Sequence, residues 1–413
     1  MTAIKFSYLP LESQLILCCA RTRFLPDHAA RVADLVSEKI HWQRVIQLAK
    51  LHGVSPLVSK NLAKVDSPQI PGEYLESLRH YTRACALLNQ FLAEELVDLV
   101  EAFRAQNIIV VPFKGPTLAC FAYGDLKLRE FGDLDLFVRQ KDLLIAREIV
   151  LSKGYQDKIG NSNPSDSELL EERFWHTFVK GNGMSSVDLQ WIMAGDHFSF
   201  LLDRQIFWEN LGEVQVNGKT VLNFTPENLL IILCVHGTKH VWESLKWICD
   251  VSELMVSCPE LDWELVGARS SQLHYRRAVH FGVYLAHWYF DVPLPNVLER
   301  DILADPDFPP LAMMVPNYLL ENPRSGVQEK YCQGAYLLLK DSCKDKWKYC
   351  WELCKTENSV VHAHLPWFYL QKRLRVLFLL AYPWRFFREN ILIPKSWQKN
   401  WSRLANSFFK GAQ

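Results

Sequence analysis

Two aspartates, one residue apart, head an apolar run at residues 133–138, which reads Asp-Leu-Asp-Leu-Phe-Val. We predict a strand here, because short apolar runs bounded by turn residues are typical of buried strands. Side chains at positions i and i+2 of a strand point to the same face, so Asp133 and Asp135 share a face. Burying a carboxylate is costly unless its charge is compensated. The pair therefore predicts bound cations, and Mg²⁺ or Mn²⁺ suits such oxygen ligands.

A third carboxylate lies in a second strand-like segment. Asp188 is flanked by apolar residues in Val187-Asp188-Leu189. If this strand pairs beside the strand that holds Asp133 and Asp135, the three carboxylates converge as catalytic and metal-binding residues. Two metal ions about 4 Å apart could then stabilise the attacking and leaving oxygens of a phosphoryl displacement.

A glycine turn precedes the paired aspartates. Lys114-Gly115-Pro116 follows the apolar run 108–113 and opens a short helical segment. A turn that leads into a helix presents free backbone N–H groups, and glycine lets the backbone approach a phosphate closely. We predict nucleotide contacts at Lys114, Gly115, Arg129 and Gly132, with the two cationic side chains neutralising a triphosphate.

The order of predicted elements indicates an α+β fold. Residues 106–220 read as strand, helix, strand, helix, strand, strand, and the last two are joined by Gly181-Asn182-Gly183, a hairpin signal. Helical periodicity dominates on both sides, and Thr225-Pro226 is a good helix start. We therefore expect a small α+β core at 106–220 between a helical region at 1–105 and a helical region with a basic tail at 221–413. Residues 160–167 are expected to form a mobile loop.

The bulk composition narrows the class of protein. The formal net charge of the 413 residues is zero, which argues against a general nucleic-acid binder. The 11 cysteines are irregularly spaced, and no secretory signal is evident at the amino terminus, so a soluble, cytoplasmic protein is expected. Cys343, Cys350 and Cys354 lack the usual spacing of zinc ligands.

A second group of polar residues follows helical spacing. His236, His240, Glu243, Trp247 and Asp250 are spaced by 4, 3, 4 and 3 residues, which predicts one stripe on a single helix. Three interpretations are open. His236, Lys239 and His240 contact the substrate, or the stripe packs on the core, or the histidine pair binds zinc. His176, just before a strand, is a further candidate for substrate contact.

These motifs resemble a known family. The KGP turn, Tyr123-Gly124-Asp125, Arg129, the run 132–136 and the run 187–191 resemble the core of the bacterial uncharacterised nucleotidyltransferases, within the DNA polymerase β-type superfamily. The resemblance implies metal-dependent transfer of a nucleotidyl group, with Asp133 and Asp135 holding metals and Asp188 completing the site. Pro116 stands where the superfamily usually has serine, and Gln190 stands where the family motif has histidine.

The sequence thus predicts an enzyme that moves a nucleoside monophosphate, AMP from ATP, to a protein, peptide or small-molecule acceptor and releases pyrophosphate. A non-catalytic nucleotide-binding scaffold and a phosphotransferase are the alternatives. Nine Lys or Arg and one Glu lie between residues 371 and 413. This basic segment either packs on the body as an amphipathic helix or contacts a membrane surface or an acidic partner.

Overall fold

The computed structural model describes residues 6–158, 175–191, 205–316 and 335–346. The chain divides into two compact units, residues 1–323 and 324–413, and the elements discussed below belong to the first. The predicted loop at 160–167, the basic segment at 371–413, Cys350 and Cys354 lie outside the described residues.

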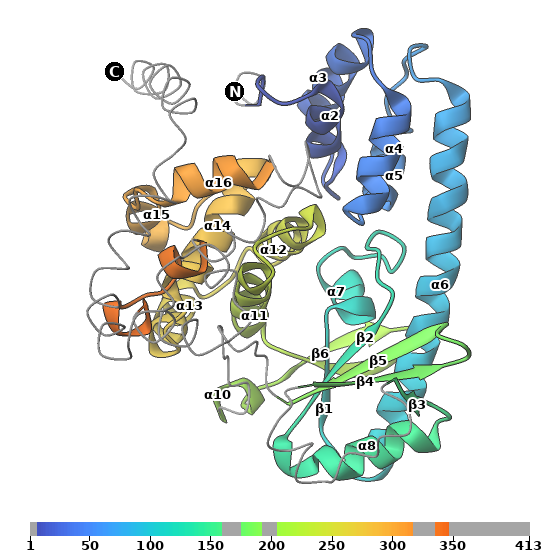
Figure 1. The fold of residues 1–413 in the computed structure, drawn as a ribbon, viewed down its shortest axis with the longest axis vertical. Helices are drawn as coiled ribbons and strands as arrows, with labels where there is room; N and C mark the ends of the chain where they lie inside the picture. Colours follow the sequence, from blue (N-terminus) through green and yellow to red (C-terminus); the bar gives the residue numbers. More distant parts are fainter. Residues whose placement is uncertain (1–5, 159–174, 192–204, 317–334, 347–413) are drawn as a thin grey trace, which may run out of the picture. The chain divides into compact units, whose positions relative to one another are not determined.

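The amino-terminal region is helical, as predicted. Its last helix, α6 (Gly72–Ala105), has 34 residues and therefore runs for about 50 Å. One end of α6 lies beside the short helices and the other end lies against the β-sheet (Figure 1). The short helices are α2 (Leu11–Cys19), α3 (Pro26–Ser37), α4 (Trp42–Leu51) and α5 (Ser55–Leu62).

The central sheet has five strands in the order β1-β2-β5-β4-β3. Strands β2 and β5 are parallel, and the other pairs are antiparallel. Helix α7 (Gly115–Phe121) follows the first strand, and η1 (Gln140–Asp142) with α8 (Leu143–Ser152) follows the second. The strands are β1 (Val110–Phe113), β2 (Leu134–Val138), β3 (Gln156–Asp157), β4 (Trp175–Lys180) and β5 (Ser185–Gln190). The predicted order is confirmed, and the short β3 is an addition to it.

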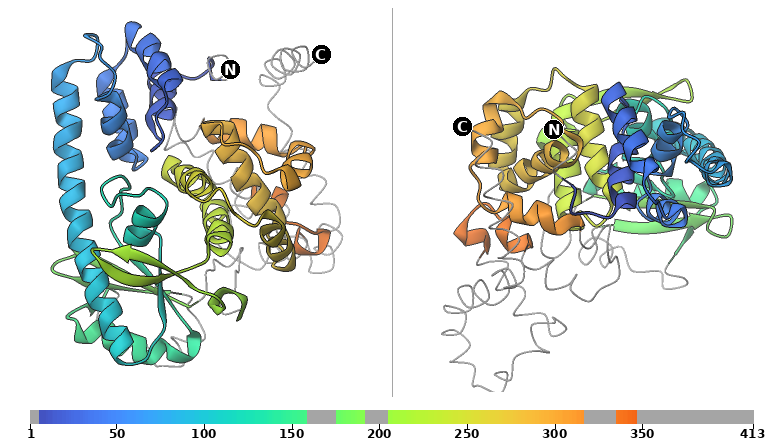
Figure 2. Two further views of the ribbon diagram at one scale, coloured as in Figure 1. Left: turned by 180° about the vertical axis from the view of Figure 1, so that it is seen from behind. Right: turned by 90° about the horizontal axis from the view of Figure 1, so that it is seen from above.

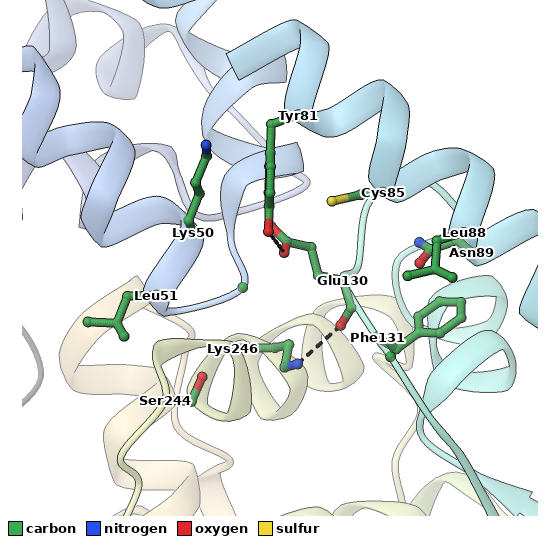
Figure 3. Close-up of a pocket in the computed structure, with 12 residues that line it drawn as sticks. Lys50, Leu51, Tyr81, Cys85, Leu88, Asn89, Glu130, Phe131, Ser244 and Lys246 are labelled. Carbon is green, nitrogen blue, oxygen red and sulfur yellow. Dashed lines mark hydrogen bonds between the residues drawn. The ribbon is translucent and has the colours of Figure 1, made fainter. Parts of the chain in front are cut away.

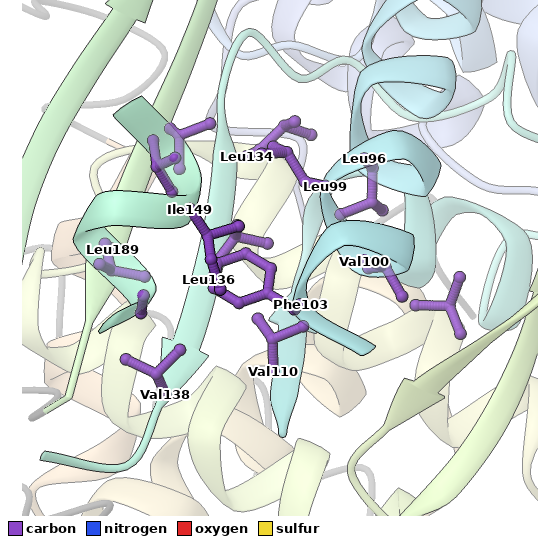
Figure 4. Close-up of a cluster of buried hydrophobic side chains, with 14 of the residues drawn as sticks. Leu96, Leu99, Val100, Phe103, Val110, Leu134, Leu136, Val138, Ile149 and Leu189 are labelled. Atoms are coloured by element: carbon purple, nitrogen blue, oxygen red, sulfur yellow. The ribbon is translucent and has the colours of Figure 1, made fainter. Parts of the chain in front are cut away.

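The two faces of this sheet have different roles. Leu134, Leu136 and Leu189 face a core that is shared with α6 and α8, where Phe103 and Ile149 pack against them (Figure 4). Because side chains alternate along a strand, the residues between these leucines point to the other face. The sequence pattern thus places every second residue of β2 and β5 away from the core.

A second hairpin was not predicted. Strands β6 (Gly212–Val216) and β7 (Lys219–Asn223) form a two-stranded sheet with Val216 opposite Lys219. Their two-residue turn is Asn217-Gly218, with φ values of 50° and 73°. Asn-Gly is the preferred sequence for such a turn because both positions need positive φ. The signal was therefore present in the sequence.

The region after β7 is again helical. Helix α11 (Pro226–Lys239) begins at the predicted cap, where the Thr225 side chain accepts a hydrogen bond from the Asn228 backbone N–H. The other helices are α10 (Gln205–Trp208), α12 (Leu245–Ser257), α13 (Trp263–Gln272), α14 (Arg276–Phe290), α15 (Asn296–Leu303) and α16 (Phe308–Pro316). Figure 2 shows α11 and α12 beside the sheet and α7. Within the described part of the chain, every helix is too short or too polar to cross a bilayer.

The prediction of one continuous helix through 236–250 is wrong. Helix α11 ends at Lys239, and α12 begins at Leu245. Between them Val241 and Trp242 have φ values of 51° and 56°, which no right-handed helix contains. The Trp242 ring fills the space that a side chain at Gly237 would need, so the turn is fixed by packing.

Candidate active site

Two of the predicted carboxylates lie side by side on the face of the sheet away from the core. Asp135 of β2 is in register with Asp188 of the parallel strand β5. Asp135 is 6% exposed, Asp188 is half-buried, and Asp133 is exposed just before β2 begins. The strand pairing that the sequence left conditional is therefore present.

The electrostatics bring the third carboxylate into the same site. Burial raises the pKa of Asp135 to about 6; Lys114 opposes this, and Asp133 and Asp188 add to it. Burial also raises the pKa of Asp188, where a hydrogen bond from Thr177 opposes the shift and Asp133 adds to it. Asp133 thus acts on both neighbours, as expected when three carboxylates share a small volume.

Three donors of the protein satisfy these carboxylates. Lys114 Nζ lies 3.0 Å from Asp135 Oδ2, and Gln190 Nε2 donates to Asp135 Oδ1 at 2.6 Å. Thr177 Oγ1 donates to Asp188 Oδ1 at 2.6 Å. Gln190 and Thr177 were not among the predicted site residues. Gln190 lies two residues after Asp188 on one strand, and this shared face was the signal that could have identified it.

The Lys114-Gly115 turn is held in an uncommon conformation beside this site. Lys114 has φ 59° and ψ −140°, a region that is almost restricted to glycine, and Gly115 has φ 46°. Thr117 Oγ1 donates to the Lys114 carbonyl oxygen at 2.7 Å. A Cβ on Gly115 would lie 3.6 Å from the Asp133 carbonyl oxygen, so the turn and the aspartate segment are in contact.

Two residues of α11 that were predicted to contact the substrate, His236 and Lys239, lie near Lys114. His236 Nε2 lies 3.4 Å from Lys114 Nζ. Burial, followed by Lys114, lowers the pKa of Lys239, whereas Asp135 and Asp188 raise it, so this ammonium group lies near both carboxylates.

The histidines of α11 are neutral at physiological pH. Burial, with help from nearby lysines, lowers the pKa of His236 well below its usual value and that of His240 to about 4. The centroids of the two imidazole rings are 4.7 Å apart. The Trp247 ring of α12 packs against both, with centroid distances of 5.3 Å to His236 and 5.0 Å to His240. Lys114 and Lys239 therefore supply the positive charge on this side of the site.

Arg129 lies in a buried ion pair. Its Nε and Nη2 donate to the two Asp250 oxygens at 2.7 Å and 2.8 Å, and the Tyr123 hydroxyl donates to Asp250 at 2.7 Å. The side chains of Arg129 and Asp250 are 3% and 1% exposed. In this structure Arg129 joins α12 to the segment before Asp133 through Asp250.

The structure does not bring His176 to the carboxylates. His176 pairs with Leu189, whereas its neighbour Thr177 pairs with Asp188, so the imidazole lies on the opposite face. Its Nε2 lies 2.6 Å from Asp157 Oδ2, and its ring stacks on Phe178 at 4.7 Å. Gly132, which was predicted to contact the nucleotide, is exposed to solvent. It lies directly before Asp133.

A family model described as "Uncharacterised nucleotidyltransferase" matches residues 38–291, more than half of the chain. The protein belongs to this family. No curated protein and no solved structure matches the chain. The match extends from the start of α4 to the end of α14 and includes the sheet, the carboxylates and α11. The protein is therefore a nucleotidyltransferase, an enzyme whose substrate is a nucleoside triphosphate.

The residues of this nucleotidyltransferase fit a divalent cation, which such enzymes generally use. Carboxylates in register on adjacent strands supply the oxygens that Mg²⁺ prefers. Among the described residues, no three His, Cys, Asp or Glu side chains are already arranged as a metal site. Lys114 instead provides the counter-charge at Asp135. A cation at Asp135 therefore requires the Lys114 ammonium group to turn away.

Proposed function

We propose that this nucleotidyltransferase moves AMP from ATP to an acceptor hydroxyl and releases pyrophosphate, with a site of the DNA polymerase β type. The observation that carries the proposal is the register of Asp135 with Asp188, with Asp133 close enough to act on both. Such a group of carboxylates suits divalent cations that bridge the protein and a triphosphate.

The roles of the side chains follow from their positions. Asp133, Asp135 and Asp188 would hold Mg²⁺ or Mn²⁺, which when bound neutralises charge on the triphosphate and on the departing pyrophosphate. Lys114 leaves Asp135 and binds the phosphates, and Lys239 adds a second positive charge. Gly115 and Gly132 leave room for the backbone to approach the nucleotide.

The chemical step is an in-line displacement. The acceptor oxygen forms a bond to the α-phosphorus while the bond from this phosphorus to the bridging oxygen breaks, and pyrophosphate leaves with the electron pair. The acceptor proton passes to Asp188, the carboxylate that lies in register with Asp135 on the neighbouring strand. Gln190 holds Asp135 in place through its hydrogen bond to Oδ1.

ATP labelled at the α or the γ position tests this proposal. Transfer of α-label to a product, or to water as AMP, supports nucleotidyl transfer, whereas transfer of the γ-label alone indicates a phosphotransferase. Tight nucleotide binding without release of either label supports a non-catalytic scaffold. Asp133→Asn removes a proposed metal ligand at an exposed position, so turnover should be lost while the circular dichroism spectrum is unchanged. Full turnover in this variant would refute the site assignment.

A further inference from the structure

A cavity of about 320 Å³ lies beside the proposed active site. It is open to solvent and is lined by α4, α6, the segment that precedes β2 and the start of α12 (Figure 3). Gly132, which lines this cavity, is the residue directly before Asp133. The cavity therefore adjoins the segment that presents the first carboxylate.

One buried lining residue fixes a wall of the cavity. Asn89 of α6 is 1% exposed, and its amide nitrogen donates to the Leu126 and Arg129 carbonyl oxygens, at 2.8 Å in each case. These two hydrogen bonds hold the segment before β2 against α6 and so fix one wall of the cavity.

The remaining polar groups of the cavity are mainly cationic. Lys246 Nζ donates one hydrogen bond, to the Glu130 carbonyl oxygen at 3.1 Å, and an ammonium group has three protons. Lys50 Nζ lies 4.5 Å from the centre of the Tyr81 ring. The Glu130 carboxylate already accepts from the Ser55 backbone N–H and the Tyr81 hydroxyl. The two lysines therefore favour an anionic group.

Lys246 also connects the cavity to the carboxylates. Burial lowers the pKa of Lys246 to about 8; Arg129 and Lys114 add to the effect, and Asp250 and Asp133 oppose it. The Lys246 ammonium group is thus within electrostatic range of Asp133 and Lys114. A ligand held by Lys246 would be adjacent to the site of transfer.

We propose that this cavity binds the acceptor, and that the acceptor is a small organic anion that carries the attacking hydroxyl. Lys50 and Lys246 bind its anionic group, and Gly132 leads its hydroxyl to Asp133. This assignment rests on the proposed nucleotidyl transfer. The acceptor oxygen bonds to the α-phosphorus, pyrophosphate leaves, and Asp188 takes the proton.

The test supplies α-labelled ATP and Mg²⁺ with D-glycerate, L-serine or glycerol 3-phosphate as probes. We expect wild-type enzyme to label at least one of them. Lys246→Met retains the alkyl stem but not the charge, and should raise the KM for that probe about tenfold or more. The Kd of an ATP analogue should be unchanged. Lys60→Met, at an exposed position of α5, is the matched control and should behave as wild type.

The outcomes separate the inference from the proposed function. Release of α-label to water with no labelled probe, or equal KM values in wild type and Lys246→Met, would overturn the acceptor assignment alone. Absence of any α-label release would refute the nucleotidyl transfer on which it rests.

A measurement on the unmodified chain does not depend on the folding of a variant. Cys85 lines the cavity, and its alkylation by iodoacetamide can be followed by peptide mass spectrometry, with exposed Cys343 as the reference. The accepted probe should slow the alkylation of Cys85, and α,β-methylene-ATP alone should not. Protection by the nucleotide analogue alone would assign the cavity to the nucleotide and overturn the proposal.

Discussion

Replacing Arg129 with Met should lower the free energy of unfolding by about 3–5 kcal/mol, the usual effect of removing one partner of a buried ion pair. Asp250 is completely buried and accepts three hydrogen bonds, two from Arg129 and one from Tyr123. In Arg129→Met the carboxylate keeps only the Tyr123 hydroxyl. Because domains are stable by about 5–15 kcal/mol, the loss is a large part of the total.

Urea unfolding followed by tryptophan fluorescence measures this effect. The double variant Arg129→Met/Asp250→Leu leaves no buried charge, so it should lose less stability than the two single variants added together. Arg79→Met is the matched control: Arg79 pairs with Glu76 on the surface of α6, both side chains are almost half exposed, and the loss should stay below about 1 kcal/mol.

The ATP affinity of Arg129→Met tests the alternative role of this residue. The sequence predicts that Arg129 neutralises the triphosphate, whereas its contacts indicate that it positions the segment before Asp133. A loss below about 1 kcal/mol in Arg129→Met, together with about tenfold weaker ATP binding, would show that Arg129 contacts the triphosphate and would contradict the buried-pair reasoning.

Further variants test the site. Lys114→Ala and Lys114→Gly both remove the ammonium partner of buried Asp135, but only glycine relieves a backbone conformation that costs about 1–3 kcal/mol, so transfer should be lost in both and urea unfolding should find Lys114→Gly the more stable of the two; equal stability would contradict the strain argument. Gln190→Leu removes a donor to the buried Asp135 carboxylate, so kcat should fall about tenfold or more and the free energy of unfolding should fall by about 1–3 kcal/mol; an unchanged kcat would exclude this role. Lys246 loses its proton above about pH 8, so the KM for the acceptor should rise there; Lys246→Arg stays charged and should abolish this rise, and a rise in both proteins would exclude Lys246 as its cause.

The elements that the sequence predicted well are those encoded locally. The strands at 108–113, 133–138 and 186–191 and the glycine turns between them follow from residues within a few positions of each other. The short period of a strand also placed Asp135 away from the leucine-rich core. The pairing of Asp135 with Asp188 was conditional in the sequence, because strand neighbours depend on contacts across about fifty residues.

The features that the sequence did not predict depend on distant packing. The turn after α11 depends on the Trp242 ring, which fills the space beside Gly237 and also packs against Gly282 of α14, a contact that no local signal specifies. Arg129 and Asp250 are 121 residues apart, so their pairing could not be read from either motif. The prediction that His176 contacts the substrate depends on the register of the β4–β5 hairpin. In this register Thr177, and not His176, lies opposite Asp188.

The long separation between Arg129 and Asp250 has a consequence for biosynthesis. At about 5–20 residues per second, a ribosome adds the 121 residues between them in roughly 6–24 seconds. During this interval the guanidinium group has no carboxylate of α12 to pair with. The contacts of this segment with Asn89 can form earlier, but the Arg129 guanidinium group reaches its final position only after α12 has been synthesised, and α12 is the last element of the proposed catalytic site to be made.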